Sequence, residues 1–403
     1  MDYILEEARK LEVKDDYDVI VAGGGFAGIA AAISSARQGA RTLLIEREYT
    51  LGGLGTLGQI IVYEPICDGL GHQVCFGLAE ELFKLSIKHG CQAEYPKYWL
   101  EGGTLEQRKQ KRFRTQYNPY VCAILMEQLL LESGVKLLYG TAVCSTHVED
   151  GLIKALIVEN KTGRYAIACK AVVDVTGDAN LYKMAGLETA LHAGGNSLVG
   201  WHYVLRDQHN LIRKYGRVRI KENDAGKSDA EKTAEAKRYA AVDADEITEM
   251  MIDSHKFVLD DFLKYGNVSE TYDLTSIATI PQVRMTRRIC GEYTMDVSEV
   301  HKAFDDSVGM YGNWRQKEDI FEIPFRTLYN GKIRNMITAG RSISVTDALW
   351  DLSRVIPVCV VTGEAAGIAA AISNDFTTLD VADIQKVLKS RGVPIHESEL
   401  DLT

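Results

Sequence analysis

Three consecutive glycines, at positions 23–25, stand between two apolar runs near the start of the chain. Residues 17–22 (YDVIVA) are rich in β-branched side chains and predict a buried strand, and the small residues after the glycines predict a helix to about Gln38. Residues 41–45 predict a second strand, with Gly39 ending the helix. This strand–turn–helix–strand order is a βαβ unit, which commits this part of the chain to a parallel sheet.

The glycines of this unit match the pattern GxGxxG at Gly23, Gly25 and Gly28. In such a loop the first glycine permits a tight turn, the second lets a pyrophosphate approach the backbone, and the third lets helix and strand pack closely. Glu46 ends the second strand 18 positions after Gly28, where a carboxylate accepts hydrogen bonds from a ribose diol. The pattern predicts a dinucleotide site. Glu46 disfavours a cofactor with a 2′-phosphate, such as NADP, whereas NAD and FAD both remain candidates.

A second glycine-rich stretch, LGGLGTLG at residues 51–58, follows the acid closely. The succession of GxGxxG, an acid and this GG-x-GT loop resembles FAD proteins of the glutathione-reductase type. The resemblance is to bacterial FAD-dependent oxidoreductases related to thiazole-synthase and heterodisulfide-reductase flavin subunits. It implies FAD as the cofactor, with the second loop along the ribityl chain and the flavin ring.

Two later stretches are similar to further motifs of that family. VVDVTGDA at residues 172–179 resembles a strand that ends in a small turn against the adenosine and pyrophosphate. Residues 336–367 resemble the C-terminal motif, in which a strand ends in Gly-Arg and a helix N-terminus points at the pyrimidine end of the flavin. Together the motifs and the resemblance give these cofactor-binding candidates: Gly23, Gly25, Phe26, Ala27, Gly28, Glu46, Arg47, Gly52, Gly53, Gly55, Thr56, Leu57, Val143, Thr176, Gly177, Gly340, Arg341, Val355, Pro357 and Val358.

The pattern of the remaining chain predicts the overall architecture. Residues 142–175 alternate with period two around two turns, which predicts a three-stranded antiparallel meander that feeds a buried parallel strand. Helical periodicity predicts helices at residues 77–89, 118–133 and about 246–264. Residues 221–238 are predicted to form a charged loop and the start of a helix. We expect an α/β fold, with a Rossmann-like FAD-binding domain that has a parallel sheet and the meander, and a smaller α+β substrate domain. The expected boundaries are 1–180 with 331–403 for the first domain and 181–330 for the second, with 92–116 as a further candidate part of the second.

Few residues are candidates for contact with a substrate. Arg354 directly precedes the predicted C-terminal helix and is a candidate active-site cation. Residues 199–206 (VGWHYVLR) alternate, placing Trp201 and Tyr203 on one face and His202 on the other, either to orient a small molecule or to pack a sheet.

A group of arginines is the other candidate. Arg284, Arg287 and Arg288 have helical spacing and either clamp a carboxylate or pair with the excess acids. The catalytic candidates are therefore Arg354, His202 and Arg287, with Tyr311, Trp314 and His72 as weaker ones.

These patterns favour an FAD-dependent oxidoreductase that transfers a hydride between flavin N5 and a small polar or anionic organic substrate. A flavin-bearing subunit that relays electrons to a protein partner is the second hypothesis, and an NAD-dependent dehydrogenase is the third. The sequence has no CxxxxC pair, and residues 180–335, where a second nucleotide site would lie, contain no GxGxxG. We therefore expect one dinucleotide site and direct exchange with a substrate, while the second electron partner and the oligomeric state stay open.

Composition further narrows the classes of function that the chain can have. The formal net charge of −10 argues against sequence-independent nucleic-acid binding. The eight cysteines stand at least eight positions apart, so the sequence predicts neither a local CxxC pair nor a metal site. Residues 1–16 are expected to form a short amphipathic helix in place of a signal peptide, and no membrane span is expected. These features predict a cytoplasmic protein.

Overall fold

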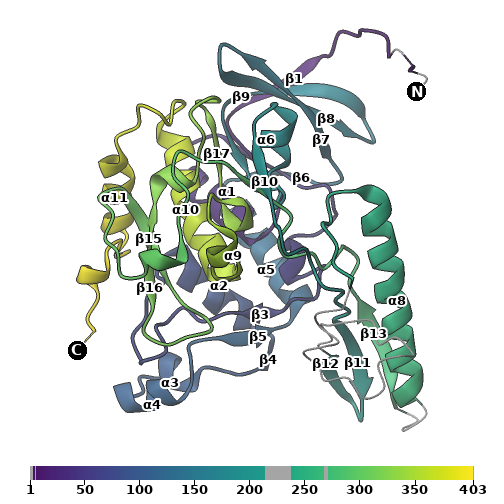
Figure 1. Cartoon of the computed structure of the whole chain (residues 1–403), viewed down its shortest axis with the longest axis vertical. Helices are drawn as coiled ribbons and strands as arrows, with labels where there is room; N and C mark the ends of the chain where they lie inside the picture. Colours follow the sequence, from purple (N-terminus) through teal and green to yellow (C-terminus); the bar gives the residue numbers. More distant parts are fainter. Residues whose placement is uncertain (1–2, 5, 214–236, 267–270, 403) are drawn as a thin grey trace.

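The computed structural model describes residues 3–4, 6–213, 237–266 and 271–402. Its main sheet has seven strands, in the order β6-β2-β1-β9-β8-β7, with β17 also pairing with β9 (Figure 1). Strand β1 (Val13–Ala22) lies between β2 (Thr42–Ile45) and β9 (Gly163–Asp174) and is parallel to both. The predicted βαβ unit is therefore present.

Strand β9 has different partners along its length. Its first half pairs antiparallel with β8 (Leu152–Asn160), which pairs with β7 (Ala142–Glu149). Its second half pairs parallel with β17 (Met336–Thr338). The predicted meander and the buried parallel strand after it are thus joined in one continuous strand. The C-terminal part of the chain enters the sheet beside it.

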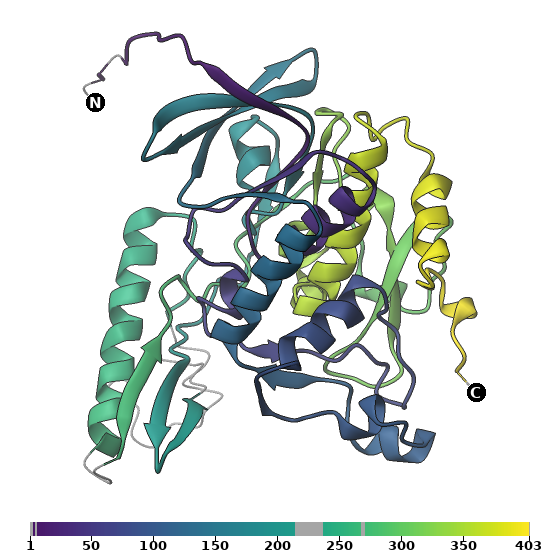
Figure 2. The same cartoon turned by 180° about the vertical axis from the view of Figure 1, so that it is seen from behind.

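Helices α1 (Phe26–Arg37) and α10 (Ile356–Ile372) pack directly on each other beneath the sheet (Figure 2). A Cβ on Gly363 would lie 2.3 Å from the carbonyl oxygen of Ala27, and one on Gly367 would lie 2.1 Å from that of Ala31. The two glycines are four residues apart and so share one helix face. Because both contacts run in the same chain direction, the helices are parallel and their N-termini point to the same side of the sheet.

The other predicted helices are also present. They are α2 (Leu78–Ile87), α5 (Pro119–Glu132) and α8 (Ala244–Gly266). The Asn118 side chain caps α5 by accepting hydrogen bonds from the N–H groups of Tyr120 and Val121. The expected N-terminal helix is wrong: the described residues before Val13 have no regular structure, and β1 begins there because its backbone pairs with β9.

A smaller α+β unit lies beside the main sheet (Figure 1). It contains a three-stranded antiparallel sheet of β12 (His209–Arg213), β11 (His202–Arg206) and β13 (Asp273–Ile277), with α8 alongside. A bidentate ion pair between Arg213 and Asp261, with Nε and Oδ2 2.6 Å apart, ties the helix to this sheet. The predicted domain boundaries stay predictions, and the expected charged loop at 221–238 falls largely outside the described residues.

The remaining elements fill the space around these layers. They are strands β3 (Val62–Tyr63), β4 (Cys91–Ala93), β5 (Thr115–Tyr117), β6 (Lys136–Leu138), β10 (Thr189–Leu191), β14 (Arg287–Ile289), β15 (Ser307–Gly312) and β16 (Ile320–Pro324), and helices α3 (Lys97–Leu100), α4 (Leu105–Gln110), α6 (Asn180–Met184), α9 (Asp347–Ser353) and α11 (Val381–Ser390). No single helix among the described residues is long and apolar enough to cross a membrane. The bent pair of α9 and α10 passes that test of length and composition, with a 91° bend.

We predict that Gly367→Val will destabilise the fold, because the added atoms collide with the backbone of α1. The expected loss is about 1–3 kcal/mol in the free energy of unfolding, the usual cost of overpacking a core. Urea unfolding measures it. Ala371→Val, in a half-buried position on the same helix, is the control and should cost about 0.5 kcal/mol through helix propensity. Equal losses in the two variants would contradict the packing argument.

Candidate functional site

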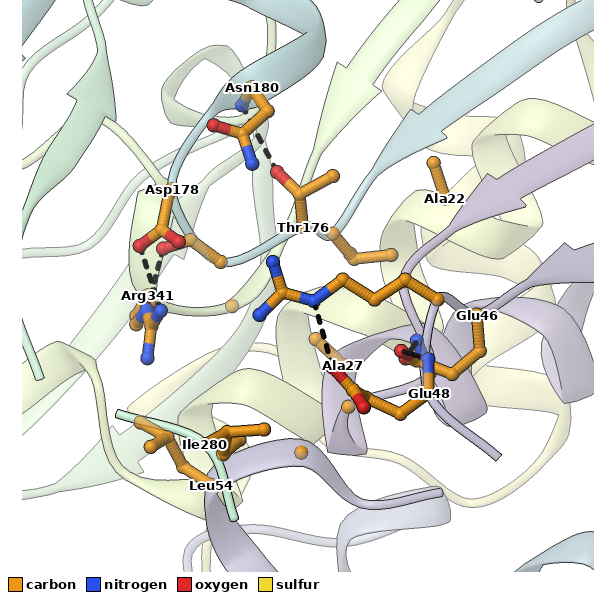
Figure 3. A pocket seen from close by; sticks show the side chains of 18 of the residues that line it. Ala22, Ala27, Glu46, Glu48, Leu54, Thr176, Asp178, Asn180, Ile280 and Arg341 are labelled. Carbon is orange, nitrogen blue, oxygen red and sulfur yellow. Dashed lines mark hydrogen bonds and ion pairs between the residues drawn. The ribbon is translucent and has the colours of Figure 1, made fainter. Parts of the chain in front are cut away.

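A cavity of about 480 Å³ lies at the carboxyl ends of four strands of the main sheet (Figure 3). It is lined by Ala22, Ile45, Val175 and Ala339, which end or directly follow β1, β2, β9 and β17. The first residues of α1 and α10 line it as well. Open α/β sheets bind ligands at this edge, because the helix N-termini there offer unpaired N–H groups.

The three glycines of the first loop have different physical roles. Gly23 has φ +116°, and a Cβ on it would lie 2.4 Å from the Val175 carbonyl oxygen. A Cβ on Gly28 would lie 1.9 Å from the Gly23 carbonyl oxygen. Both glycines are therefore required by the fold itself. A Cβ on Gly25 would meet nothing within 4 Å. Gly25 begins α1 without any side-chain cap, so the space in front of that helix is open.

Glu46 joins this loop to the end of β2. Its Oε2 accepts a hydrogen bond from the Gly24 N–H at 2.6 Å, and its Oε1 accepts one from the Glu48 N–H at 2.9 Å. Burial raises the pKa of Glu46 above its ordinary value of 4.5, although both of these hydrogen bonds act to lower it. Thr141, Ala142 and Val143 line the cavity with Glu46.

The second glycine loop lies against the first. The Gly52 N–H donates to the Gly24 carbonyl oxygen at 2.8 Å. The Thr56 hydroxyl donates to the Leu51 carbonyl oxygen, which closes the second loop on itself. The Thr279 N–H donates to the Leu57 carbonyl oxygen at 3.0 Å. The residues that follow β13 therefore lie across the second loop.

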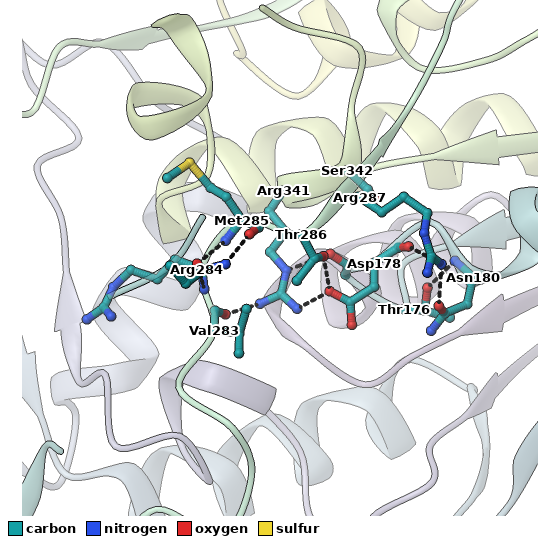
Figure 4. A network of polar contacts seen from close by, with 12 residues as sticks. Thr176, Asp178, Asn180, Val283, Arg284, Met285, Thr286, Arg287, Arg341 and Ser342 are labelled. Carbon is teal, nitrogen blue, oxygen red and sulfur yellow. Dashed lines mark hydrogen bonds and ion pairs between the residues drawn. The ribbon is translucent and has the colours of Figure 1, made fainter. Parts of the chain in front are cut away.

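Arg341 organises another wall of the cavity (Figure 4). Its Nη2 lies 2.8 Å from Oδ1 of Asp178, and its Nε donates to the Gly177 carbonyl oxygen at 2.6 Å. Its Nη1 donates to the Val283 carbonyl oxygen at 2.9 Å. Arg341 thus connects the turn after β9 to the residues before β14, and Asp178 compensates its charge.

The structure brings most of the predicted cofactor-binding residues together around this cavity. Those that line it are Gly23, Gly25, Phe26, Ala27, Glu46, Arg47, Gly52, Gly53, Gly55, Leu57, Val143, Thr176, Gly177, Gly340 and Arg341. Gly28, Thr56, Val355, Pro357 and Val358 are not among the lining residues, although their neighbours Ala27, Gly55, Leu57 and Ile356 are. Of the catalytic candidates, only Arg354 lines the cavity.

His202 and the weaker candidates lie elsewhere. His202 is fully buried in β11, with Nδ1 2.9 Å from the Gly200 carbonyl oxygen and Nε2 3.3 Å from Asp261 of α8. Tyr311 stacks on Phe321 in the core. Trp314 donates to the Asp351 carbonyl oxygen, and His72 pairs with Asp68 at 2.7 Å. None of these candidates is among the cavity-lining residues.

The expected helical spacing of the arginines is wrong, because β14 (Arg287–Ile289) pairs with β10 and is a strand. Successive side chains of a strand point to opposite faces. Arg287 therefore reaches the Asp178 carbonyl oxygen and Asn180, each at 3.3 Å, while Arg288 lies 3.8 Å from Asp347. The three arginines do not form one clamp.

Sequence reasoning missed several lining residues. Gly24, Leu54 and Asp178 stand inside motifs that the sequence already marked, so the motif spacing could have found them. Ala241 and Ile247 come from the start of α8 and the residues before it, and Ile280 comes from the crossing after β13. No local signal marks these three, because only the tertiary packing of the smaller unit brings them to the cavity.

Known proteins share short segments with this chain. A nicotine dehydrogenase of Pseudomonas putida is 60% identical over 38 residues, 9% of this chain and 8% of that protein. An iron-sulfur subunit of the CoB–CoM heterodisulfide reductase of Methanopyrus kandleri is 45% identical over 49 residues, 12% of this chain and 7% of that protein. The aligned segments thus span less than a tenth of these relatives.

Solved structures and a family model extend over more of the chain. A geranylgeranyl bacteriochlorophyll reductase-like protein of Thermoplasma acidophilum has a TM-score of 0.48 and 13% identity, over 94% of this chain and 84% of that one. The L-proline dehydrogenase of P. horikoshii has a TM-score of 0.41 and 12% identity, over 95% and 100%. The model of the FAD dependent oxidoreductase family matches residues 18–256 and 201–388. Because the ranges matched by this family model cover most of the chain, the protein belongs to the family of FAD-dependent oxidoreductases, with FAD as its cofactor.

Proposed function

We propose that this oxidoreductase holds FAD in the cavity at the strand ends and transfers a hydride between flavin N5 and a small polar or anionic organic substrate. The observation that carries the proposal is that one cavity is lined by both glycine loops, Glu46, Arg354 and the first residues of two parallel helices. Bound FAD would supply the hydride acceptor or donor. The protein supplies binding, orientation and electrostatics.

The first loop fits the diphosphate end of the cofactor. The space in front of Gly25 is the one place in the GxGxxG pattern where a side chain would meet no protein atom. The N–H groups at the start of α1 face an anion there, and the helix dipole favours negative charge. Each Glu46 oxygen accepts one backbone hydrogen bond and keeps a second lone pair for a ribose hydroxyl.

The residues around α10 fit the opposite, flavin end. α10 begins after Val355 with no side-chain cap, and Ile356 and Cys359 of its first turn line the cavity. A helix N-terminus stabilises negative charge on a group placed before it, by roughly 0.3–2 kcal/mol. Arg354 stands directly before this helix. This end of the cavity therefore combines two sources of positive potential where a flavin and an anionic substrate would meet.

A panel of small molecules tests the proposed reaction. Under anaerobic conditions, at least one hydroxy acid, amine, sugar or enoate should bleach the oxidised flavin absorbance or restore it after chemical reduction. Stopped-flow absorbance near the flavin maximum follows the change. If no small molecule exchanges electrons with the flavin while a protein partner does, the electron-relay hypothesis replaces this one.

Gly25→Ser separates cofactor binding from folding. The new Cβ meets no protein atom, and a serine at a helix N-cap accepts a hydrogen bond from the N–H groups that we assign to the diphosphate. The free energy of unfolding of the apoprotein should therefore stay the same or rise. The affinity for FAD, measured by quenching of flavin fluorescence, should fall at least about 10-fold through this competition.

Gly28→Ala provides the contrast to that variant. Its methyl group would collide with the Gly23 carbonyl oxygen, so this variant should lose stability as well as FAD binding. If Gly25→Ser binds FAD as tightly as the unchanged protein, the diphosphate does not lie in front of α1.

The pH dependence of FAD affinity tests the role of Glu46. The ribose hydroxyls donate to the ionised carboxylate, so affinity is fully present above the pKa of Glu46 and is lost as the pH falls through it. Because burial raises this pKa, the loss should begin at a higher pH than for an ordinary glutamate with pKa 4.5.

Two variants complete this pH experiment. Glu46→Gln should flatten the profile and weaken binding about 10-fold at pH 8, because a neutral amide replaces a charged acceptor. Glu48→Gln, which changes a neighbouring acid that also lines the cavity, is the control: it should keep the loss of affinity at low pH, shifted slightly to lower pH because the Glu48 charge helps to raise the pKa of Glu46. Identical profiles for all three proteins would contradict the assignment of Glu46.

A further inference from the structure

Arg284 is held at the edge of the cavity by the segment that crosses the second glycine loop. Thr279 donates to Leu57, and the Gln282 side-chain Nε2 donates to the Gly58 carbonyl oxygen at 2.6 Å. The same amide bonds to the backbone of Trp201, with its Oε1 accepting from the Trp201 N–H at 3.0 Å. Val283, the next residue, lines the cavity. Two of these hydrogen bonds hold the segment before Arg284 against the second loop, and the Arg284 N–H donates to Oδ1 of Asn196 at 3.2 Å.

The charge of Arg284 is poorly compensated. Its guanidinium lies over the Trp201 ring, 5.5 Å from the ring centre, and Nη1 makes one long hydrogen bond of 3.5 Å to the Gln282 carbonyl oxygen. It makes no ion pair with any residue that the structure describes. Figure 4 shows its side chain pointing away from the network of Arg341 and Asp178. Burial, together with the nearby charge of Arg354, lowers the pKa of Arg284 to about 10.

The acid whose charge acts on Arg284, Asp351, is already engaged by two other arginines. Arg354 and Arg315 both form ion pairs with the carboxylate of Asp351. Burial by itself would raise the pKa of Asp351, but the charges of Arg354 and Arg315 outweigh it and hold this pKa below its ordinary value. Arg354 and Arg315 thus pair with this carboxylate directly, and Arg284 interacts with it only at longer range. The described residues leave this corner with surplus positive charge.

We propose that Arg284 and Arg354 bind the carboxylate of the substrate, so that the substrates of this enzyme are small organic carboxylates. Arg354 lines the cavity, and Arg284 follows the lining residue Val283 in the sequence, with its guanidinium close enough to Arg354 for the two charges to interact. A planar carboxylate offers two oxygens that match the fork of a guanidinium. Its negative charge would compensate the positive charge that Asp351 leaves on these arginines. The stacking on Trp201 keeps the Arg284 side chain in place before the substrate arrives. This inference rests on the proposed function, because it names the substrate of the same site.

Binding without turnover provides the first test. Benzoate and butyrate, with benzamide and butyramide as neutral matches, are titrated at constant ionic strength into the FAD-loaded protein and followed by the shift of the flavin absorbance. At least one carboxylate should bind about 10-fold or more tightly than its amide, because only the carboxylate forms charge-assisted hydrogen bonds. Equal affinity within both pairs, no binding by either carboxylate, or tighter binding of inorganic phosphate would overturn the inference.

Variants of Arg284 provide the second test. Arg284→Met keeps an apolar stem over Trp201 and removes the charge, and it should weaken carboxylate binding about 10- to 100-fold. Arg284→Lys keeps the charge and should recover part of the affinity. Arg326→Met is the matched control, because Arg326 pairs with Asp306 and is absent from the cavity lining. It should leave carboxylate binding unchanged.

The stability of the apoprotein distinguishes a binding role from a structural one. If Arg284 serves to bind an anion, its uncompensated charge costs stability, and Arg284→Met should raise the urea midpoint of the apoprotein. A lowered midpoint together with unchanged carboxylate affinity would overturn the inference. Failure of the proposed function gives a different result: carboxylates would still bind with the expected preference, but no small molecule would bleach the flavin.

Discussion

The contact between α1 and α10 is the constraint on which the rest of the structure depends. Gly363 and Gly367 leave no side chain between the two helices, so backbone meets backbone at the Ala27 and Ala31 carbonyl groups. This close approach lets one N-terminal helix and one C-terminal helix lie parallel beneath the same sheet. Both then deliver their N-termini to the strand ends, and the cavity forms there.

Polar contacts between loops complete the shape of the site. Glu46 holds Gly24 through a buried carboxylate, and Gly24 in turn accepts from Gly52, so both glycine loops are tied to the end of β2. Arg341 does the same on the other wall, where Asp178 compensates its charge. These contacts hold the walls of the cavity in place relative to one another. Arg284 differs from them, because it forms no ion pair with a described acid.

Sequence reasoning predicted the α/β fold, the βαβ unit, the meander and the cofactor. These features are encoded within short stretches: Gly23 and Gly28 are required by atoms of the same loop or of the strand beside it, and the second loop follows within a few residues. The position of Arg354 at the cavity follows from a local feature as well, since Arg354 directly precedes the helix whose first turn lines the cavity. Alternation along residues 199–206 correctly suggested a strand but could not say that His202 faces Asp261 in the core.

The sequence by itself therefore determined the fold class, FAD as the cofactor and the glycine loops that line the cavity, because helix and strand periods and glycine spacings are local properties. Only the tertiary structure determines which arginines form an ion pair with an acid and which do not. Arg287 and Arg288 point apart because β10, about a hundred residues away, pairs with β14 and makes it a strand. Arg341 is neutralised by Asp178, whereas Arg284 has no such partner among the described residues. Charge compensation depends on distances between segments remote in the chain, which no local pattern encodes.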